Sequence, residues 1–196
     1  MNEELIVKYI VACTNLYGVV PIEKVVEIYN DQNEETVSIN GVESFLQSAQ
    51  VKVQLEESFV YIESGEFVAE ATSEVDEKQS LKLAAEGKPY YVPHKEELLR
   101  YMDEEYFQET PEQMIVKNML KEDSYDPADI EEDVAELVYN LQVSGGDFMM
   151  DLSLFLAGLE LLVKDQERYI PVIVDVADTT RLWENRGHTM KELQQQ

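Results

Sequence analysis

Basic side chains are scarce in this 196-residue sequence, because 15 Lys and Arg stand against 41 Asp and Glu and give a formal net charge of -26. A surface this acidic repels nucleic-acid phosphates and anionic lipid headgroups, so we expect no direct binding to nucleic acid or to a membrane. The same charge would attract a basic protein or divalent cations. Apolar residues make up 44% of the chain, which is enough to build a hydrophobic core.

Cysteine and histidine are rarer still. Cys13 is the single cysteine, which excludes a disulfide within the chain and a cysteine-rich zinc site. The two histidines, His94 and His188, each stand beside a predicted helix start, and the HExxH motif is absent. The sequence also lacks the GxSxG, P-loop and GxGxxG motifs. We therefore expect no enzymatic activity, no metal and no cofactor.

Long apolar runs and targeting signals are also missing. No run approaches the roughly 20 apolar residues that a membrane-spanning helix requires. The longest candidate, Phe155–Val163, contains Glu160. The first ten residues, MNEELIVKYI, are acidic rather than basic and do not resemble a secretory signal. The sequence thus predicts a cytoplasmic protein.

Residues 1–72 predict a winged-helix-like domain, which is a set of three helices followed by a β-hairpin. Helical spacing and capping residues predict helices at Glu3–Tyr17, from Pro21 to Asn30, and at Ser38–Ala49. Alternating apolar residues in Val51–Leu55 predict a strand, and Phe59–Ile62 predicts its return.

A winged helix often reads DNA through its third helix. The predicted third helix, Ser38–Ala49, contains no Lys or Arg, and the predicted hairpin offers only Lys52. Residues 1–72 hold 13 acidic and three basic residues, which gives a net charge of -10. Because DNA binding requires several cationic phosphate contacts, a protein-binding or purely structural role is the better interpretation.

The stretch Gly87–Phe107 is predicted to be a junction, since Gly87 and Pro89 end one helix and Pro93 begins another. Its aromatic residues have two readings. They pack a domain junction, or they line a groove for a partner, and the candidate contact residues are then Tyr90, Tyr91, Tyr101 and Tyr106.

Residues 73–196 predict an all-helical domain, so the fold class is α+β and mostly α. Helix starts are predicted at Thr110-Pro111, Asp126-Pro127 and Thr189, with a break at Gly145-Gly146. Phe148–Val163 is apolar on most sides and is predicted to be the central buried helix of this domain. Arg168–Glu184 is predicted to be a last long helix that bends or begins at Pro171.

Residues 122–151 contain ten acidic residues and no basic one. The segment Asp123–Val134 lacks the ligand spacing of an EF-hand calcium loop. These carboxylates either cap helices and face solvent, or form a row that imitates a phosphate backbone. The candidate partner-contact residues in this segment are Asp126, Asp129, Glu132, Asp133 and Glu136.

Three segments carry a family resemblance: LYGVVPIEKVVEIYN at Leu16–Asn30, Gly87–Phe107, and TTRLWENRGHTMKEL at Thr179–Leu193. They resemble a group of bacterial proteins in which a similar helical region often precedes a C-terminal zinc-binding SEC-C module. No cysteines follow the GHT turn in this sequence, so we expect no such module and carry over no zinc site. The resemblance implies an α-rich protein in two parts and supplies no catalytic residue.

These observations favour a non-catalytic cytoplasmic adaptor or regulator whose partner is a protein, with a basic protein as one option. The alternative hypothesis is an acidic inhibitor of phage or mobile-element origin that mimics nucleic acid. A metal-dependent enzyme with an unrecognised site is the third hypothesis.

Overall fold

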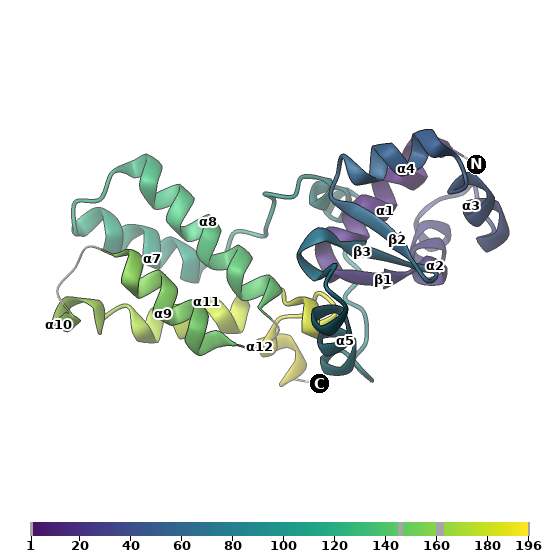
Figure 1. The fold of residues 1–196 in the computed structure, drawn as a ribbon. Helices are drawn as coiled ribbons and strands as arrows, with labels where there is room; N and C mark the ends of the chain where they lie inside the picture. The colour runs from purple at the N-terminus through teal and green to yellow at the C-terminus, as the bar shows by residue number, and fades with distance from the viewer. Residues whose placement is uncertain (1, 145–146, 160–162, 196) are drawn as a thin grey trace. The chain divides into compact units, whose positions relative to one another are not determined.

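The computed structural model describes residues 2–144, 147–159 and 163–195. The chain folds as two compact units, Met1–Tyr106 and Phe107–Gln196. Helices predominate and one small antiparallel sheet is present (Figure 1), which confirms an α+β fold that is mostly α. The predicted boundary at residues 72/73 falls inside the first unit.

The first unit joins short helices to a three-stranded sheet. Its elements are α1 (Glu3–Tyr17), β1 (Val19–Pro21), α2 (Ile22–Gln32), α3 (Ile39–Phe45), α4 (Ala49–Glu56), β2 (Val60–Glu63), β3 (Glu66–Ala69), the 3-10 turn η1 (Glu70–Thr72), α5 (Val75–Ala84), α6 (Lys95–Leu98) and the 3-10 turn η2 (Leu99–Met102).

Helix α1 is the centre of this unit, because it is buried on every side. The six consecutive side chains of Tyr9–Thr14 are at most 4% exposed, and because successive residues are about 100° apart, they point to every side of the helix. Helix α2, strand β3 and the segment that holds α6 and η2 all pack on α1. Burial of this many apolar side chains is the main source of stability in the unit.

Side chains of α1 and α2 hold the segment at residues 88–106 by hydrogen bonds to the backbone of that segment. The Asn15 amide donates a hydrogen bond to the Tyr101 carbonyl at 2.8 Å, and the Tyr17 hydroxyl donates one to the Tyr91 carbonyl at 2.7 Å. Gln32 of α2 donates another to the Pro93 carbonyl at 2.8 Å. These contacts place the segment in the first unit and explain why the units divide only after Tyr106.

The sheet has the strand order β1-β3-β2, with both pairs antiparallel. Ser64 and Gly65 connect β2 to β3 with φ values of 51° and 84°, as a two-residue hairpin turn requires. The hairpin therefore lies at Val60–Ala69, so the predicted pairing of Val51–Leu55 with Phe59–Ile62 is wrong.

Val51–Leu55 belongs to helix α4 instead of a strand. Val51 and Leu55 are buried one helical turn apart, whereas Val53, between them, is 53% exposed. Alternation over five residues includes an i, i+4 pair, so this short pattern fits a helix as well as a strand. Glu66–Ala69 supplies the strand that pairs with β2.

The second unit is helical throughout the residues that the structure describes. Its elements are α7 (Pro111–Glu122), α8 (Pro127–Val143), α9 (Phe148–Gly158), α10 (Val163–Gln166), α11 (Ile170–Thr179), the 3-10 turn η3 (Trp183–Asn185) and α12 (Met190–Leu193). Within it α7, α8, α9 and α11 pack side by side around one core (Figure 1). Gly145-Gly146 and residues 160–162 lie outside the described residues.

Local capping confirms the predicted helix starts of this unit. Thr110 and Thr189 each form a capping box, and the Asp126 carboxylate accepts a hydrogen bond from the Ala128 N–H at 2.9 Å. The predicted long helix at Arg168–Glu184 is shorter than expected. It spans Ile170–Thr179, has Pro171 in its first turn and ends before the turn η3.

Candidate functional site

The four candidate tyrosines lie within the first unit. Tyr101 is only 2% exposed, and its ring meets that of Tyr106 edge-on at 4.8 Å. Tyr90 packs edge-on against Tyr17 of α1 at 4.9 Å, and the Tyr91 hydroxyl donates a hydrogen bond to Glu97 at 3.4 Å. These contacts favour the packing interpretation, because Tyr101 would have to leave the core to touch a partner.

The candidate carboxylates lie on α8, and we call four of them the α8 acidic stripe: Asp129, Glu132, Asp133 and Glu136. Asp133 is half-buried and the other three are exposed. In the part of the chain that the structure describes, none of the four forms an ion pair. Asp126 caps the helix instead. The stripe therefore presents uncompensated negative charge.

The negative charge of the stripe is concentrated around Asp133, as the pKa of its carboxyl shows. Burial raises the pKa of the Asp133 carboxyl, and the nearby carboxylates of Asp129, Glu136 and Glu132 raise it further. Glu131 is different, because it pairs with Lys117 of α7 at 2.5 Å. Lys117, only 8% exposed, also contacts Glu109 at 3.3 Å. Lys117 is thus engaged by carboxylates outside the stripe.

Helix α9 exposes an apolar surface, which the sequence did not predict. Met149 is 69% exposed, Met150 is 54% exposed and Leu154 is 52% exposed. Ser153 and Ala157 are exposed on the same side, and the five residues together are the α9 apolar face. The predicted central buried helix is therefore a surface helix in the described residues, since it covers the core with only one side. Large exposed apolar patches commonly mark sites of protein binding.

The α8 acidic stripe lies on the helix next to this apolar face, because α8 and α9 pack against each other. Helix α8 packs against both α7 and α9, and the Lys117–Glu131 pair identifies the flank that faces α7. Since an α-helix turns about 100° per residue, Asp129, Asp133 and Glu136 lie roughly 140–200° around the helix from Glu131. They are thus on the side of α8 away from α7. The acidic stripe and the apolar face therefore lie on two helices that pack against each other.

A hollow of about 450 Å³ lies in the first unit between α4 and strand β2. Its floor is apolar and includes Leu46, Leu55 and Val60. Its walls carry one base, Lys52, and two acids, Glu43 and Glu56. The size suits a small ligand or an apolar side chain, but these charged groups do not form a recognisable catalytic set.

Cys13 and the histidines show no arrangement for catalysis. Burial raises the pKa of the Cys13 thiol far above its ordinary value, so this thiol is not a ready nucleophile. His94 is exposed at the start of α6, and His188 Nδ1 lies 3.2 Å from Glu192. Across residues 2–144, 147–159 and 163–195, no three His, Cys, Asp or Glu side chains are grouped so as to hold a metal ion.

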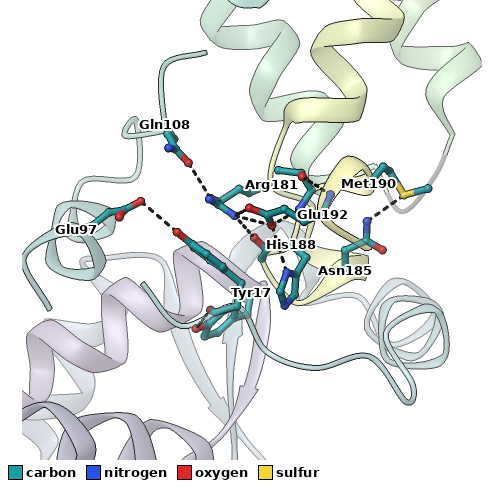
Figure 2. Close-up of polar contacts among 11 residues, drawn as sticks. Tyr17, Glu97, Gln108, Arg181, Asn185, His188, Met190 and Glu192 are labelled. Carbon is teal, nitrogen blue, oxygen red and sulfur yellow. Dashed lines mark hydrogen bonds and ion pairs between the residues drawn. The ribbon is translucent and has the colours of Figure 1, made fainter. Parts of the chain in front are cut away.

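Arg181 organises a polar cluster at the end of the second unit (Figure 2). Its Nε donates a hydrogen bond to Gln108 at 3.0 Å, and its Nη1 donates one to the Gly187 carbonyl at 3.0 Å. The same Nη1 pairs with Glu192 at 3.2 Å. Because Arg181 is 9% exposed and these partners belong to its own unit, we interpret the cluster as structural.

The pKa of the Glu192 carboxyl shows that this cluster stabilises its negative charge. Burial alone would raise its pKa, but the Thr189 backbone N–H, the Arg181 guanidinium and His188 together outweigh burial and lower it. Sequence reasoning identified the Thr189 capping box and missed Arg181. The capping spacing is local, whereas the contact with Gln108 joins residues 73 positions apart.

Comparison with known proteins gives no matching family model, no matching curated protein and no matching solved structure. None of the described helices combines the length and the apolar character that crossing a membrane requires.

Proposed function

We propose that this protein is a non-catalytic interaction module that binds a protein partner through the α9 apolar face and the α8 acidic stripe, which lie on two helices that pack against each other. The observation that carries the proposal is the exposure of Met149, Met150 and Leu154 on one side of a single helix. Exposing three large apolar side chains together is unfavourable in water, and a bound partner would remove them from it.

We also propose that the first unit is winged-helix-like and that its role is not DNA reading. The order of helix, strand, helices and hairpin, with β1 paired to β3, supports the first statement. The helix that precedes the hairpin is α4, and Lys52 is its only basic residue. A DNA-reading surface needs several phosphate contacts, and α4 supplies at most one.

Two further expectations from the sequence stay proposals. One is the relation to the bacterial proteins that carry SEC-C modules, and the other is a cytoplasmic location. The Thr179–Leu193 segment, part of that resemblance, forms the Arg181 cluster, which fits motifs that serve packing and capping rather than chemistry.

The test is affinity purification from the native cell with three versions of the chain. The wild type is compared with Met150→Ser/Leu154→Ser on α9 and with Met114→Ser/Ile115→Ser on α7. The α7 pair is a matched control, since its side chains are 39% and 48% exposed. We expect a stoichiometric protein with the wild type and the α7 variant, and its loss with the α9 variant. Equal recovery with all three, or no stoichiometric protein at all, would contradict the proposal.

The α8 acidic stripe also favours the alternative function, inhibition of a nucleic-acid-binding protein by mimicry. From Asp129 to Glu136 the stripe spans roughly 10 Å, about the length of three phosphates along one DNA strand. If mimicry were the function, duplex DNA would displace the partner and the α9 substitutions would leave binding unchanged. A native-gel titration with a basic DNA-binding protein, repeated with competitor duplex, separates the two functions.

A further inference from the structure

We infer that the partner segment bound by this surface is a cationic amphipathic helix, which lies along α9 with its apolar side on the α9 apolar face and its Lys or Arg side chains over the α8 acidic stripe. This inference rests on the proposed function and specifies its partner. It follows from the shape, the flexibility and the charge of the surface.

The shape favours a helix as the occupant. The apolar face runs from Met149 to Ala157 along one helix, a length of roughly 12 Å or a little over two helical turns. A partner helix can match this length with side chains at positions i, i+3, i+4 and i+7. An extended peptide would need an open strand edge to pair with, and the described residues after Tyr106 include no strand.

The chemistry of the face suits apolar side chains of varied shape. Met149 and Met150 are unbranched and flexible, so they can repack around different apolar groups. Leu154 lies about one turn beyond Met150 and provides a more rigid contact. The surface therefore selects for apolar character at helical spacing rather than for one particular sequence.

The charge favours a basic partner over other occupants. Asp129, Asp133 and Glu136 lie on α8, which packs against α9, and they form no ion pair in the described structure. Over residues 107–196 the sequence has 19 acidic and seven basic residues, a net charge of -12. A second copy of this chain would bring the same negative charge to the interface, and an acidic helix would be repelled in the same way.

The experiment measures binding of defined synthetic peptides to the full chain by fluorescence anisotropy. The probe is a 14-residue peptide whose Leu residues follow helical spacing on one side and whose Lys residues occupy the other. A scrambled peptide of the same composition tests the spacing, and a peptide with Glu in place of Lys tests the charge. Each is measured at low and at moderate salt concentration.

Four variants locate the binding surface. Met150→Ser/Leu154→Ser removes apolar contacts, and Asp129→Asn/Asp133→Asn/Glu136→Gln removes charge. The matched controls are Met114→Ser/Ile115→Ser on α7 and Glu74→Gln/Asp76→Asn/Glu77→Gln at α5, which neutralises the same number of exposed acids elsewhere. Circular dichroism checks that each variant keeps its helices.

We expect the Leu/Lys helix to bind and the scrambled and Glu peptides to bind at least tenfold more weakly. The α9 variant should lose about tenfold in affinity and the α8 variant several-fold, with a weaker salt dependence. The two controls should match the wild type. If the scrambled peptide binds equally well, the attraction is charge alone and the inference is wrong.

The remaining outcomes distinguish this inference from the proposed function. If the α9 and α8 variants bind the helix like the wild type, its site is elsewhere and the inference fails. If the peptides do not bind but purification yields a partner that depends on Leu154, the proposed function stands and only the cationic helix is wrong. Self-association that depends on Leu154, measured by sedimentation, would make a second copy the occupant and would also overturn the inference.

Discussion

Helices α1 and α9 are both apolar on nearly all sides, yet one is buried and the other is not. In the first unit, α2, the sheet and the segment at residues 88–106 pack around α1 and bury side chains such as Ile10 and Leu16 completely. In the second unit, α8 and α11 pack against α9, and Met149, Met150 and Leu154 stay exposed.

The last segment of each unit accounts for this difference. Residues 88–106 end the first unit by lying across α1, held by Asn15 and Tyr17. In the second unit, residues 180–193 fold back on themselves and on Gln108 through Arg181. Packing elements therefore surround α1, whereas in the described structure α8 and α11 cover only one side of α9. This difference is what makes the α9 apolar face a candidate binding surface.

The largest expected effect is on the buried helix. Leu16→Ala should lower the free energy of unfolding by about 2–5 kcal/mol, because it leaves a cavity in a fully buried position. Chemical denaturation followed by circular dichroism measures the change. Leu83→Ala, at a side chain that is 65% exposed on α5, is the control in the same unit and should change stability by no more than about 0.5 kcal/mol. Equal effects would mean that α1 is not the core that the structure describes.

The second effect concerns the cluster that closes the second unit. Arg181→Met should cost about 2 kcal/mol, because it leaves the Gly187 carbonyl and the Glu192 carboxylate without their buried partner. Part of the full penalty is relieved by water, since the Glu192 side chain is 39% exposed. Lys191→Met, an exposed substitution in the same segment, is the control. A loss no larger than that of Lys191→Met would show that the cluster does not fasten the chain.

The third effect tests the fastening of residues 88–106 to α1. Tyr17→Phe removes the hydrogen bond to the Tyr91 carbonyl and should cost about 1 kcal/mol. Limited proteolysis should then cut faster within residues 88–106. Tyr61→Phe, which loses an exposed hydrogen bond to Glu70, should leave both measurements unchanged. Unchanged cleavage in Tyr17→Phe would mean that apolar packing alone holds the segment.

These elements also show what the sequence could and could not predict. Helix starts at Thr110, Asp126 and Thr189 were predicted correctly, because each cap is a contact within three residues along the chain. The strand predicted at Val51–Leu55 was wrong, because five alternating residues fit both the period of a strand and the period of a helix. Whether α9 is covered depends on segments that are distant in the sequence. Its apolar composition therefore predicted a buried helix, whereas the structure shows one exposed side.

One part of the candidate site was predicted from the sequence and the other part was not. The acidic residues of α8 were identified from composition, and the structure adds only that their helix packs against α9. The α9 apolar face was missed, because a helix that is apolar on every side reads as buried. Its one distinguishing signal was the local density of Met, which is common at adaptable binding surfaces.

A smaller effect should appear as a dependence of stability on pH. The folded pKa of Glu192 lies below its unfolded value, so its charged form stabilises the fold. That contribution is complete above the pKa of the unfolded carboxyl and is lost as the pH falls through the folded pKa. Glu192→Gln should therefore flatten the acidic limb of the stability curve, and its effect should be smaller than that of Arg181→Met. An unchanged acidic limb would assign the pH dependence to other carboxyls, such as Asp123, whose pKa is also lowered.

The smallest expected effect is on the exposed helix. Met150→Ser/Leu154→Ser should change the free energy of unfolding by no more than about 0.5 kcal/mol per residue, because both side chains already contact water. The measurement is the same denaturation experiment as for Leu16→Ala. A loss as large as that of a core substitution would mean that another segment or a second copy covers α9 in solution. A near-zero change combined with lost peptide binding is the result that only a binding surface would give, since a residue that serves folding cannot be removed without cost.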